Sequence, residues 1–212
     1  MNIIGDVAGQ FSALMRLVNK MPKDDLLFVG DLIDRGPKSR QVVEWVKDNA
    51  KCLKGNHEHM AVDHALRRHE YDRMCWLNNG GDRTLDSYEN HPELLEEHIE
   101  WMDKLPLYYE DKEILVTHAP ISYEFNNWQD CLENDHRYEY GDYVLWCRKS
   151  PRKRDKFQIF GHNSCWGLKW FDDIRITKKK QDGSWAVCLD ASSSKKLTGI
   201  SWQSGEIFQE RF

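Results

Sequence analysis

Short apolar runs alternate with longer amphipathic stretches over the first quarter of the chain. Asn2–Gly5, Leu26–Gly30 and Cys52–Gly55 each have the length and the bounding residues of a strand. Between them, segments 11–18 and 42–46 carry apolar residues at the spacing of an amphipathic helix. Because a parallel strand–helix–strand unit needs a crossover connection, this alternation predicts a parallel sheet.

The pattern then changes from helical to strand-rich. Segment 58–104 is mostly helical in pattern, with Pro92 at a first-turn position. Two segments without regular pattern, Ser122–Tyr143 and Lys149–Lys156, are expected to be exposed loops. Further strands are predicted at Ile114–His118, Phe157–Gly161, Trp185–Asp190, Thr198–Trp202 and Glu206–Gln209. We expect the strand-rich last third of the chain to form a second sheet packed on the first. The predicted fold is an α/β sandwich of two mixed sheets flanked by helices.

Composition narrows the class of protein. The 212 residues, 40% of them hydrophobic, suffice for one substantial core, so we expect a single domain over 1–212. The net charge of −5 gives no overall attraction to nucleic acid or anionic membranes, so an anionic substrate needs a local site. The N-terminus has no basic leader, no apolar run approaches the ~18 residues of a membrane span, and the cysteines are scattered like reduced thiols. We expect a monomeric cytoplasmic protein without membrane or nucleic-acid partners.

Polar residues that could bind a metal or take part in catalysis follow the first three predicted strands. Asp6 comes after Gly5, Asp31 and Asp34 follow Gly30, and Asn56 and His57 follow Gly55. The carboxyl ends of parallel strands share one edge of a sheet, where ligands of open α/β folds bind. These side chains are therefore expected to meet.

Two later strands each end in a histidine, His118 and His162. Oxygen donors mixed with neutral imidazoles suit Mn²⁺, Fe²⁺ or Zn²⁺ better than Ca²⁺, and thiolates are absent from these motifs. A carboxylate such as Asp31 can bridge two ions about 3.5–4 Å apart, an arrangement that activates water and stabilises displacement at phosphorus. Taken singly, each histidine would more often be a core or loop residue, and only the joint pattern indicates a metal centre.

The ordered motifs resemble those of a known family. They are similar to the phosphoprotein phosphatase branch of the calcineurin-like metallophosphoesterases, whose pattern is Gly-Asp-x-His-Gly, Gly-Asp-x-x-Asp-Arg-Gly, Gly-Asn-His-Glu, then His-Ala and Gly-His. The chain most resembles the compact serine/threonine phosphatases of bacteriophage lambda and enterobacteria. The resemblance continues through residues 76–82, 105–107 and 145–148.

The resemblance implies a hydrolase of phosphoric esters with two divalent ions, for which we expect manganese, with iron or zinc as alternatives. Asp6 and Asp31 would hold the first ion. The second ion would be held by Asp31, Asn56, His118 and His162.

The same resemblance implies the groups that act on substrate. His57 would be the general acid at the leaving oxygen, oriented by Asp34. Arg35 and Arg148 would grip the phosphoryl oxygens, with Asn56 and His57 completing the substrate-binding set. Direct attack of water on phosphorus, without a phosphoenzyme, is expected. Arg148 has an alternative, which is pairing with the acidic loop Ser122–Tyr143.

One position departs from the family pattern. Ala8 stands where the first motif has histidine, so the first ion loses a ligand, which we expect to weaken its occupancy and the activity at least about 10–100-fold. The remaining machinery is intact, which favours a deliberate histidine-to-alanine replacement that traps a bound ligand. The alternative is a natural variant that works with one ion or recruits a neighbour, for which Gln10 would be a poor neutral substitute.

Three functions remain open at this point. The first is hydrolysis of phosphoserine or phosphothreonine in proteins. The second is a nucleotide-directed reaction on a dinucleoside polyphosphate, a cyclic nucleotide or an RNA end, for which Tyr123, Phe125 and Trp128 could stack a base or equally cover the protein's own core. The third is a binding protein that holds a phosphorylated ligand without turnover.

Overall fold

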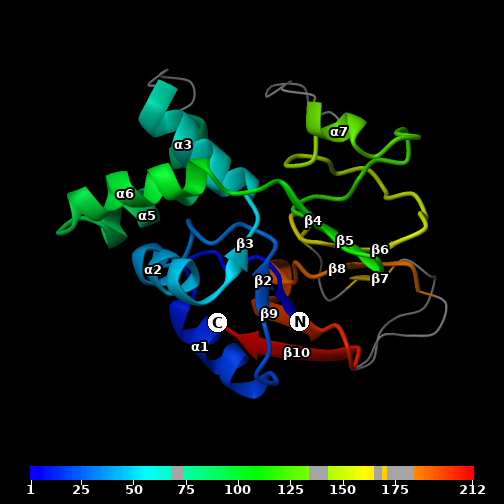
Figure 1. Cartoon of the computed structure of the whole chain (residues 1–212). Coiled ribbons are helices and arrows are strands. Elements are labelled where there is room, and N and C mark those ends of the chain that lie inside the picture. Colours follow the sequence, from blue (N-terminus) through cyan, green and yellow to red (C-terminus); the bar gives the residue numbers. More distant parts are fainter. Residues whose placement is uncertain (68–73, 134–142, 165–168, 171–183) are drawn as a thin grey trace.

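Two five-stranded sheets form the framework of the protein. A computed structural model describes residues 1–67, 74–133, 143–164, 169–170 and 184–212 (Figure 1). The predicted α/β sandwich of two mixed sheets flanked by helices is confirmed. The single-domain organisation over 1–212 stays a prediction.

The first sheet contains the three N-terminal strands. Its order is β10-β9-β1-β2-β3, and β1, β2 and β3 run parallel, as predicted. The strands are β1 (Asn2–Ile4), β2 (Leu26–Phe28), β3 (Lys51–Cys52), β9 (Lys196–Ser201) and β10 (Glu206–Arg211). Ile3 lies opposite Leu27 on one side and opposite Ile200 of antiparallel β9 on the other.

The second sheet has the order β4-β5-β6-β8-β7. Its strands are β4 (Tyr108–Glu110), β5 (Ile114–Thr117), β6 (Phe157–Phe160), β7 (Lys169–Trp170) and β8 (Ala186–Cys188). The central strands β5, β6 and β8 are parallel, and β4 and β7 flank them antiparallel. The parallel strands of both sheets therefore present their carboxyl ends together.

The two sheets pack face to face through one apolar cluster. Ile3, Leu27 and Ile200 from the first sheet share it with Val116 and Ile159 from the second, and all five are buried. Burial of apolar side chains on the two inner faces is what holds a sandwich together.

Helices cover the outer face of the first sheet. The helical elements are α1 (Phe11–Lys20), α2 (Ser39–Asn49), α3 (Asn56–Arg67), η1 (Leu77–Gly81), α5 (Asp82–Ser87), α6 (Pro92–Asp103), α7 (Asp130–Glu133) and η2 (Ser192–Ser194). Leu14 and Leu17 of α1 and Val46 of α2 are buried in a cluster with Phe28 of β2. None of the helices in the described residues is long and apolar enough to cross a membrane.

Two features of the topology differ from the sequence-based expectation. The last two strands do not extend the second sheet but return to the first, where β9 pairs with β1 and β10 pairs with β9. Within the supposed loop Ser122–Tyr143, α7 forms and Cys131 is buried, because apolar side chains there cover the outer face of the second sheet. Residues 134–142 of that loop lie outside the described residues.

A buried carboxylate on α3 joins the ends of β2 and β3. The Oε2 atom of Glu58 accepts the N–H groups of Asp31 and Gly55, both at 2.8 Å, and its Oε1 accepts that of Leu32 at 2.7 Å. These N–H groups belong to chain that has left its strand, so without Glu58 they would lack an acceptor. The side chain thus fixes the backbone on which Asp31 stands.

We expect Glu58→Gln to lower the free energy of unfolding by about 1–3 kcal/mol for each buried N–H that loses its acceptor, measured by urea denaturation. Glu44→Gln is the matched control, because Glu44 makes only a part-exposed pair with Arg40 on α2 and such pairs contribute about 0.5 kcal/mol or less. Equal, small losses in both variants would contradict a structural role for Glu58.

Candidate functional site

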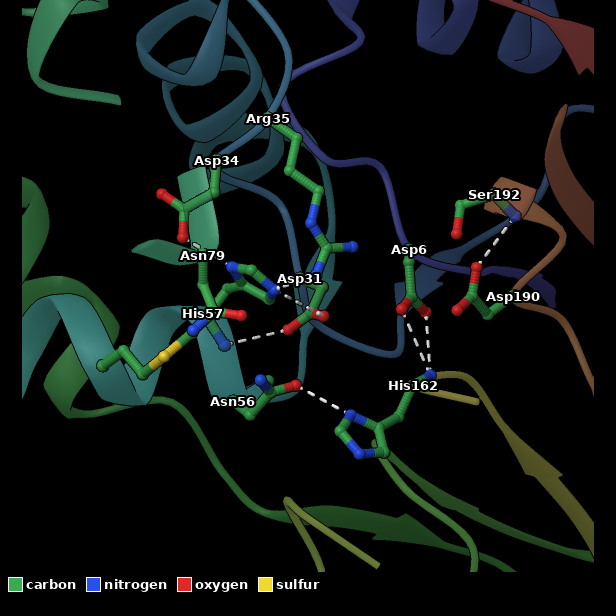
Figure 2. Close-up of polar contacts among 12 residues, drawn as sticks. Asp6, Asp31, Asp34, Arg35, Asn56, His57, Asn79, His162, Asp190 and Ser192 are labelled. Carbon is green, nitrogen blue, oxygen red and sulfur yellow. Dashed lines mark hydrogen bonds and ion pairs between the residues drawn. The ribbon is translucent and has the colours of Figure 1, made fainter. Parts of the chain in front are cut away.

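Six strand ends bring polar side chains to the seam between the sheets. The residues after β1, β2 and β3 are Asp6, Asp31 and Asn56, and those after β5, β6 and β8 are His118, His162 and Asp190. All six are buried. Figure 2 shows Asp6, Asp31, Asn56, His162 and Asp190 grouped at this seam. The predicted meeting of the strand ends has therefore occurred, with Asp190 as an unpredicted member.

The seam is so narrow that two of its positions require glycine. A Cβ atom on Gly161 would lie 2.0 Å from Oδ1 of Asp6, and one on Gly5 would lie 2.8 Å from the carbonyl oxygen of Leu189. Glycine at these positions lets the ends of β1, β6 and β8 approach one another closely.

Five site residues adopt positive φ angles that side chains normally avoid: Ala8, Asp31, Asp34, Arg35 and His162. Each of their N–H groups donates to a fixed acceptor. The acceptors are the carbonyl oxygens of Asp31 and Gly80 and the side chains of Glu58, Thr84, Ser39 and Asp6. Backbone strain of this kind persists only where surrounding contacts hold it, and it concentrates at functional sites.

Asp31, His118 and His162 form a compact set of metal-capable donors. One ligand atom from each lies within 4.8 Å of the others, and all three residues are buried. The Oδ1 atom of Asn56 lies 2.9 Å from Nε2 of His118 and 2.8 Å from Nδ1 of His162. These are the residues expected to hold the second ion.

The protonation pattern of His118 fits a cation in this set. Its Nδ1 lies 2.9 Å from the carbonyl oxygen of Val29, an acceptor, so this nitrogen carries the proton of the neutral ring. Burial lowers the pKa of His118 and favours the neutral form. The Nε2 lone pair then faces the Oδ1 atoms of Asn56 and Asp31, at 2.9 and 3.3 Å. Facing lone pairs repel, and a metal ion among them would convert repulsion into coordination.

His162 has the same character. Burial, the neighbouring imidazole of His118 and nearby Arg148 lower the pKa of His162 to about 2, so its imidazole is neutral. Its Nε2 atom is buried without a hydrogen-bond partner. Such an orphaned nitrogen fits a ligand that the protein itself does not supply.

Asp6 lies on the other side of Asp31. Its carboxylate accepts the backbone N–H of His162 at 3.1 and 3.2 Å. Burial, together with the nearby carboxylates of Asp190 and Asp31, raises the pKa of Asp6 well above its usual value. Three carboxyl groups are thus gathered where the first ion is expected.

Ala8 offers no ligand atom to this region. It is 7% exposed, and its N–H donates to the carbonyl oxygen of Asp31 at 2.9 Å. Gln10, the neutral substitute considered above, has its amide nitrogen against Gly36. Among the described residues, only the set with His118 and His162 brings three metal-capable side chains within 4.8 Å.

His57 is held by Asp34. Nδ1 of His57 lies 2.5 Å from Oδ2 of Asp34, whose carboxylate also accepts Trp76 Nε1–H at 3.0 Å and Thr84 Oγ1–H at 2.6 Å. Burial disfavours the imidazolium, but the carboxylates of Asp31 and Asp34 outweigh it and raise the pKa of His57. The imidazole ring is therefore held in one orientation, and its protonated form is favoured.

Two arginines flank this pair. Arg35 is exposed, and its Nη2 donates to Nε2 of His57 at 2.8 Å (Figure 2), while its backbone N–H binds the carbonyl oxygen of Gly80. Arg148 is exposed too, and its positive charge contributes to the lowered pKa of His162. Both guanidinium groups can reach an anion from solvent.

Sequence reasoning missed three supporting groups. Trp76 and Thr84 bind Asp34, and Asp190 joins the carboxylates. Trp76 carried no signal beyond the family resemblance at residues 76–82 and Thr84 carried none, because hydrogen bonds between residues far apart in the chain leave no local pattern. Asp190 did carry a signal, because it directly follows an apolar run, much as Asp6 follows the first strand after one glycine.

A two-sheet sandwich with buried carboxylates and neutral imidazoles at its strand ends, beside an oriented His–Asp pair, defines the class of metal-dependent phosphoesterases. The comparison with known families agrees. The chain belongs to the calcineurin-like phosphoesterase family, whose model matches residues 2–188.

Curated relatives divide between two substrate classes. The chain is 31% identical over 160 residues to a symmetrical bis(5'-nucleosyl)-tetraphosphatase of Vibrio parahaemolyticus, covering 70% of this chain and 55% of that protein. It is 41% identical over 85 residues to serine/threonine-protein phosphatase 1 of Salmonella typhimurium, covering 38% of each. The matched part thus spans about half or less of these relatives.

Solved structures share the fold. A metallophosphoesterase from Sphaerobacter thermophilus superposes with a TM-score of 0.62 at 15% identity, covering 100% of this chain and 88% of that one. A protein serine/threonine phosphatase from Saccharomyces cerevisiae gives 0.59 at 16% identity, covering 100% and 79%.

We expect Mn²⁺ at a hundred times its dissociation constant to raise the free energy of unfolding by about 2.7 kcal/mol, because only the folded chain assembles the donors. His118→Ala should abolish most of this shift, measured as the difference between Mn²⁺ and EDTA in thermal unfolding. His91→Ala, on an exposed histidine before α6, is the control. A full Mn²⁺ shift in the His118 variant would contradict its assignment as a ligand.

Proposed function

We propose that the chain hydrolyses phosphoric monoesters with two divalent ions, Mn²⁺ by preference. One observation carries this proposal. The metal-capable donors Asn56 and His118 face each other with their lone pairs, and His57, the residue after Asn56, is held in a fixed orientation by Asp34. The ions, when bound, would activate water and neutralise charge on the phosphoryl group. The residues then have separate tasks around that group.

Arg35 and Arg148 bind and position the phosphoryl oxygens in this proposal. Without substrate, Arg35 donates to Nε2 of His57. A phosphate offers a guanidinium stronger, bidentate hydrogen bonds, so substrate would draw Arg35 away from the imidazole. Nε2 of His57 would then be free to carry a proton toward the leaving oxygen.

Asp34 keeps the general acid in place. Its hydrogen bond fixes the proton on Nδ1 of His57 and supports the charged ring, while Trp76 and Thr84 prevent the carboxylate from turning. The arrangement delivers the proton from Nε2 to the departing oxygen as the bond to phosphorus breaks.

Occupancy of the first ion would set the level of activity. Ala8 removes the imidazole that the family pattern places beside Asp6, so we propose that activity is lower than with histidine at this position.

For the substrate, we propose phosphoserine or phosphothreonine in a protein. Phe125 and Trp128, two aromatic residues considered for base stacking, pack instead against a cluster that contains buried Ile121, and Trp128 meets Tyr108 edge-to-face with ring centroids 4.9 Å apart. Only Tyr123 of that trio remains exposed, at 55%. The 41% identity with the Salmonella phosphatase supports the same substrate.

A nucleotide substrate is the second candidate. It is favoured by the likeness to the Vibrio tetraphosphatase, which extends over 160 residues. Tyr123 would then be the available stacking platform.

His57→Asn should lower kcat about 10²–10⁴-fold on a phosphoserine peptide, whose alkoxide leaving group needs a proton. The loss should be much smaller on para-nitrophenyl phosphate, because its leaving group departs readily as an anion. Steady-state rates on both substrates, with His91→Asn as the control, measure the difference. Equal losses on the two substrates would exclude His57 as the general acid.

The substrate proposal predicts a kcat/KM for the phosphopeptide at least about tenfold above that for diadenosine tetraphosphate, equivalent to about 1.4 kcal/mol in transition-state binding. Tyr123→Ala should leave the phosphopeptide rate unchanged. The reverse preference, with a loss of about 1–3 kcal/mol of dinucleotide binding in Tyr123→Ala, would establish the nucleotide candidate instead.

A further inference from the structure

Asp190 is the strand-end residue to which the proposed reaction gives no task. It follows β8 and is 3% exposed, at a depth where aspartate is rarely found unless it is paired or bound to a metal. The close contact between Gly5 and the carbonyl of Leu189 makes the residues that follow, Asp6 and Asp190, neighbours across the two sheets.

The two carboxylates face each other. One oxygen of Asp190 accepts the backbone N–H of Ser192 at 2.9 Å, and the other is turned toward Asp6 (Figure 2). The bond to Ser192 explains the first oxygen as part of a turn. It leaves unexplained why the second is buried against another carboxylate.

Charge makes this arrangement costly without a cation. Asp6, Asp31 and Asp190 are 7%, 4% and 3% exposed, so three carboxyl groups are buried at the same end of the two sheets. Carboxylates buried together are normally compensated by a metal ion or a proton.

The donor set described above lies directly beside these carboxylates. Asp31, the carboxylate between the two regions, is also a member of the donor set with His118 and His162, and Nε2 of His162 is buried without a partner. The backbone N–H of His162 in turn binds Asp6. Asp6, Asp31 and Asp190 thus adjoin the donor set with His118 and His162, and Asp31 belongs to both.

We propose that Asp190 is a protein ligand of the first metal ion and replaces the histidine that is missing at position 8. The first ion is then held by Asp6, Asp31 and Asp190. This inference rests on the metal-dependent function proposed above. The oxygens of these three carboxylates do not all lie within 4.8 Å of one another, as the ligand atoms of Asp31, His118 and His162 do.

Four proteins test the assignment: the parent chain, Asp190→Asn, Ala8→His and the double variant. Asparagine keeps an oxygen acceptor for Ser192 and removes the charge. Mn²⁺ binding is counted by equilibrium dialysis, and paramagnetic resonance separates magnetically coupled Mn²⁺ pairs from single ions. Asp48→Asn on exposed α2 surface is the matched control.

The parent is expected to bind two Mn²⁺ ions and give the coupled signal. In Asp190→Asn, affinity at the first site should fall at least about 10–100-fold and the coupled signal should be lost, while the second ion remains. In the Ala8→His background the same change should cost much less, because the imidazole takes over. Unfolding in EDTA should show that the variants fold alike.

The outcomes separate this inference from the function on which it rests. A parent that binds no Mn²⁺ overturns both. Two ions bound equally well by the parent and by Asp190→Asn, a single ion in the parent, or an equal loss in the Ala8→His background overturns the role of Asp190 alone.

Discussion

The carboxylate of Glu58 is the contact on which the site depends. The chain turns sharply after β2 and exposes N–H groups that no strand can satisfy, and each such group would cost about 1–3 kcal/mol if it were buried without an acceptor. Glu58 accepts those of Asp31 and Leu32 and also binds Gly55, so the ends of β2 and β3 are fixed to the start of α3. Asp31, the carboxylate that both proposed ions would share, takes its orientation from this contact.

The same principle extends through the seam. Positive φ angles cost on the order of 1–3 kcal/mol each in non-glycine residues, yet Asp34, Arg35 and His162 all adopt them. Each is tolerated because its N–H has a fixed acceptor supplied by a different part of the chain. Burial of the apolar core stabilises the fold, and part of that stabilisation offsets the backbone strain that holds the side chains of the seam in place. A site of this kind is rigid before any ligand binds, which suits ions that need defined geometry.

The sequence predicted those parts of the molecule that local pattern controls. Apolar runs that end at Gly30 and Gly55 indicated the parallel strands and the residues that follow them, and the donor set around His118 lies where those motifs implied. The return of β9 to pair with β1 could not be predicted, because antiparallel pairing between distant segments depends on the whole core. Asp190 was missed for a related reason. A single aspartate after a strand has no motif of its own, and its meaning comes from a neighbour nearly the whole chain away.

The two halves of the centre differ in donor chemistry, and this difference bears on which ion each can hold. Imidazoles from His118 and His162 make the second site suitable for Mn²⁺, Fe²⁺ or Zn²⁺. With Asp190 in place of an imidazole, the first site would offer carboxylate oxygen alone, a set that favours the harder ions Mn²⁺ and Mg²⁺ over Zn²⁺. In the proposed centre, alanine instead of histidine at position 8 would therefore change more than affinity. It would shift the metal selectivity of the first site, leave that of the second site unchanged, and make activity depend on the supply of a hard divalent cation.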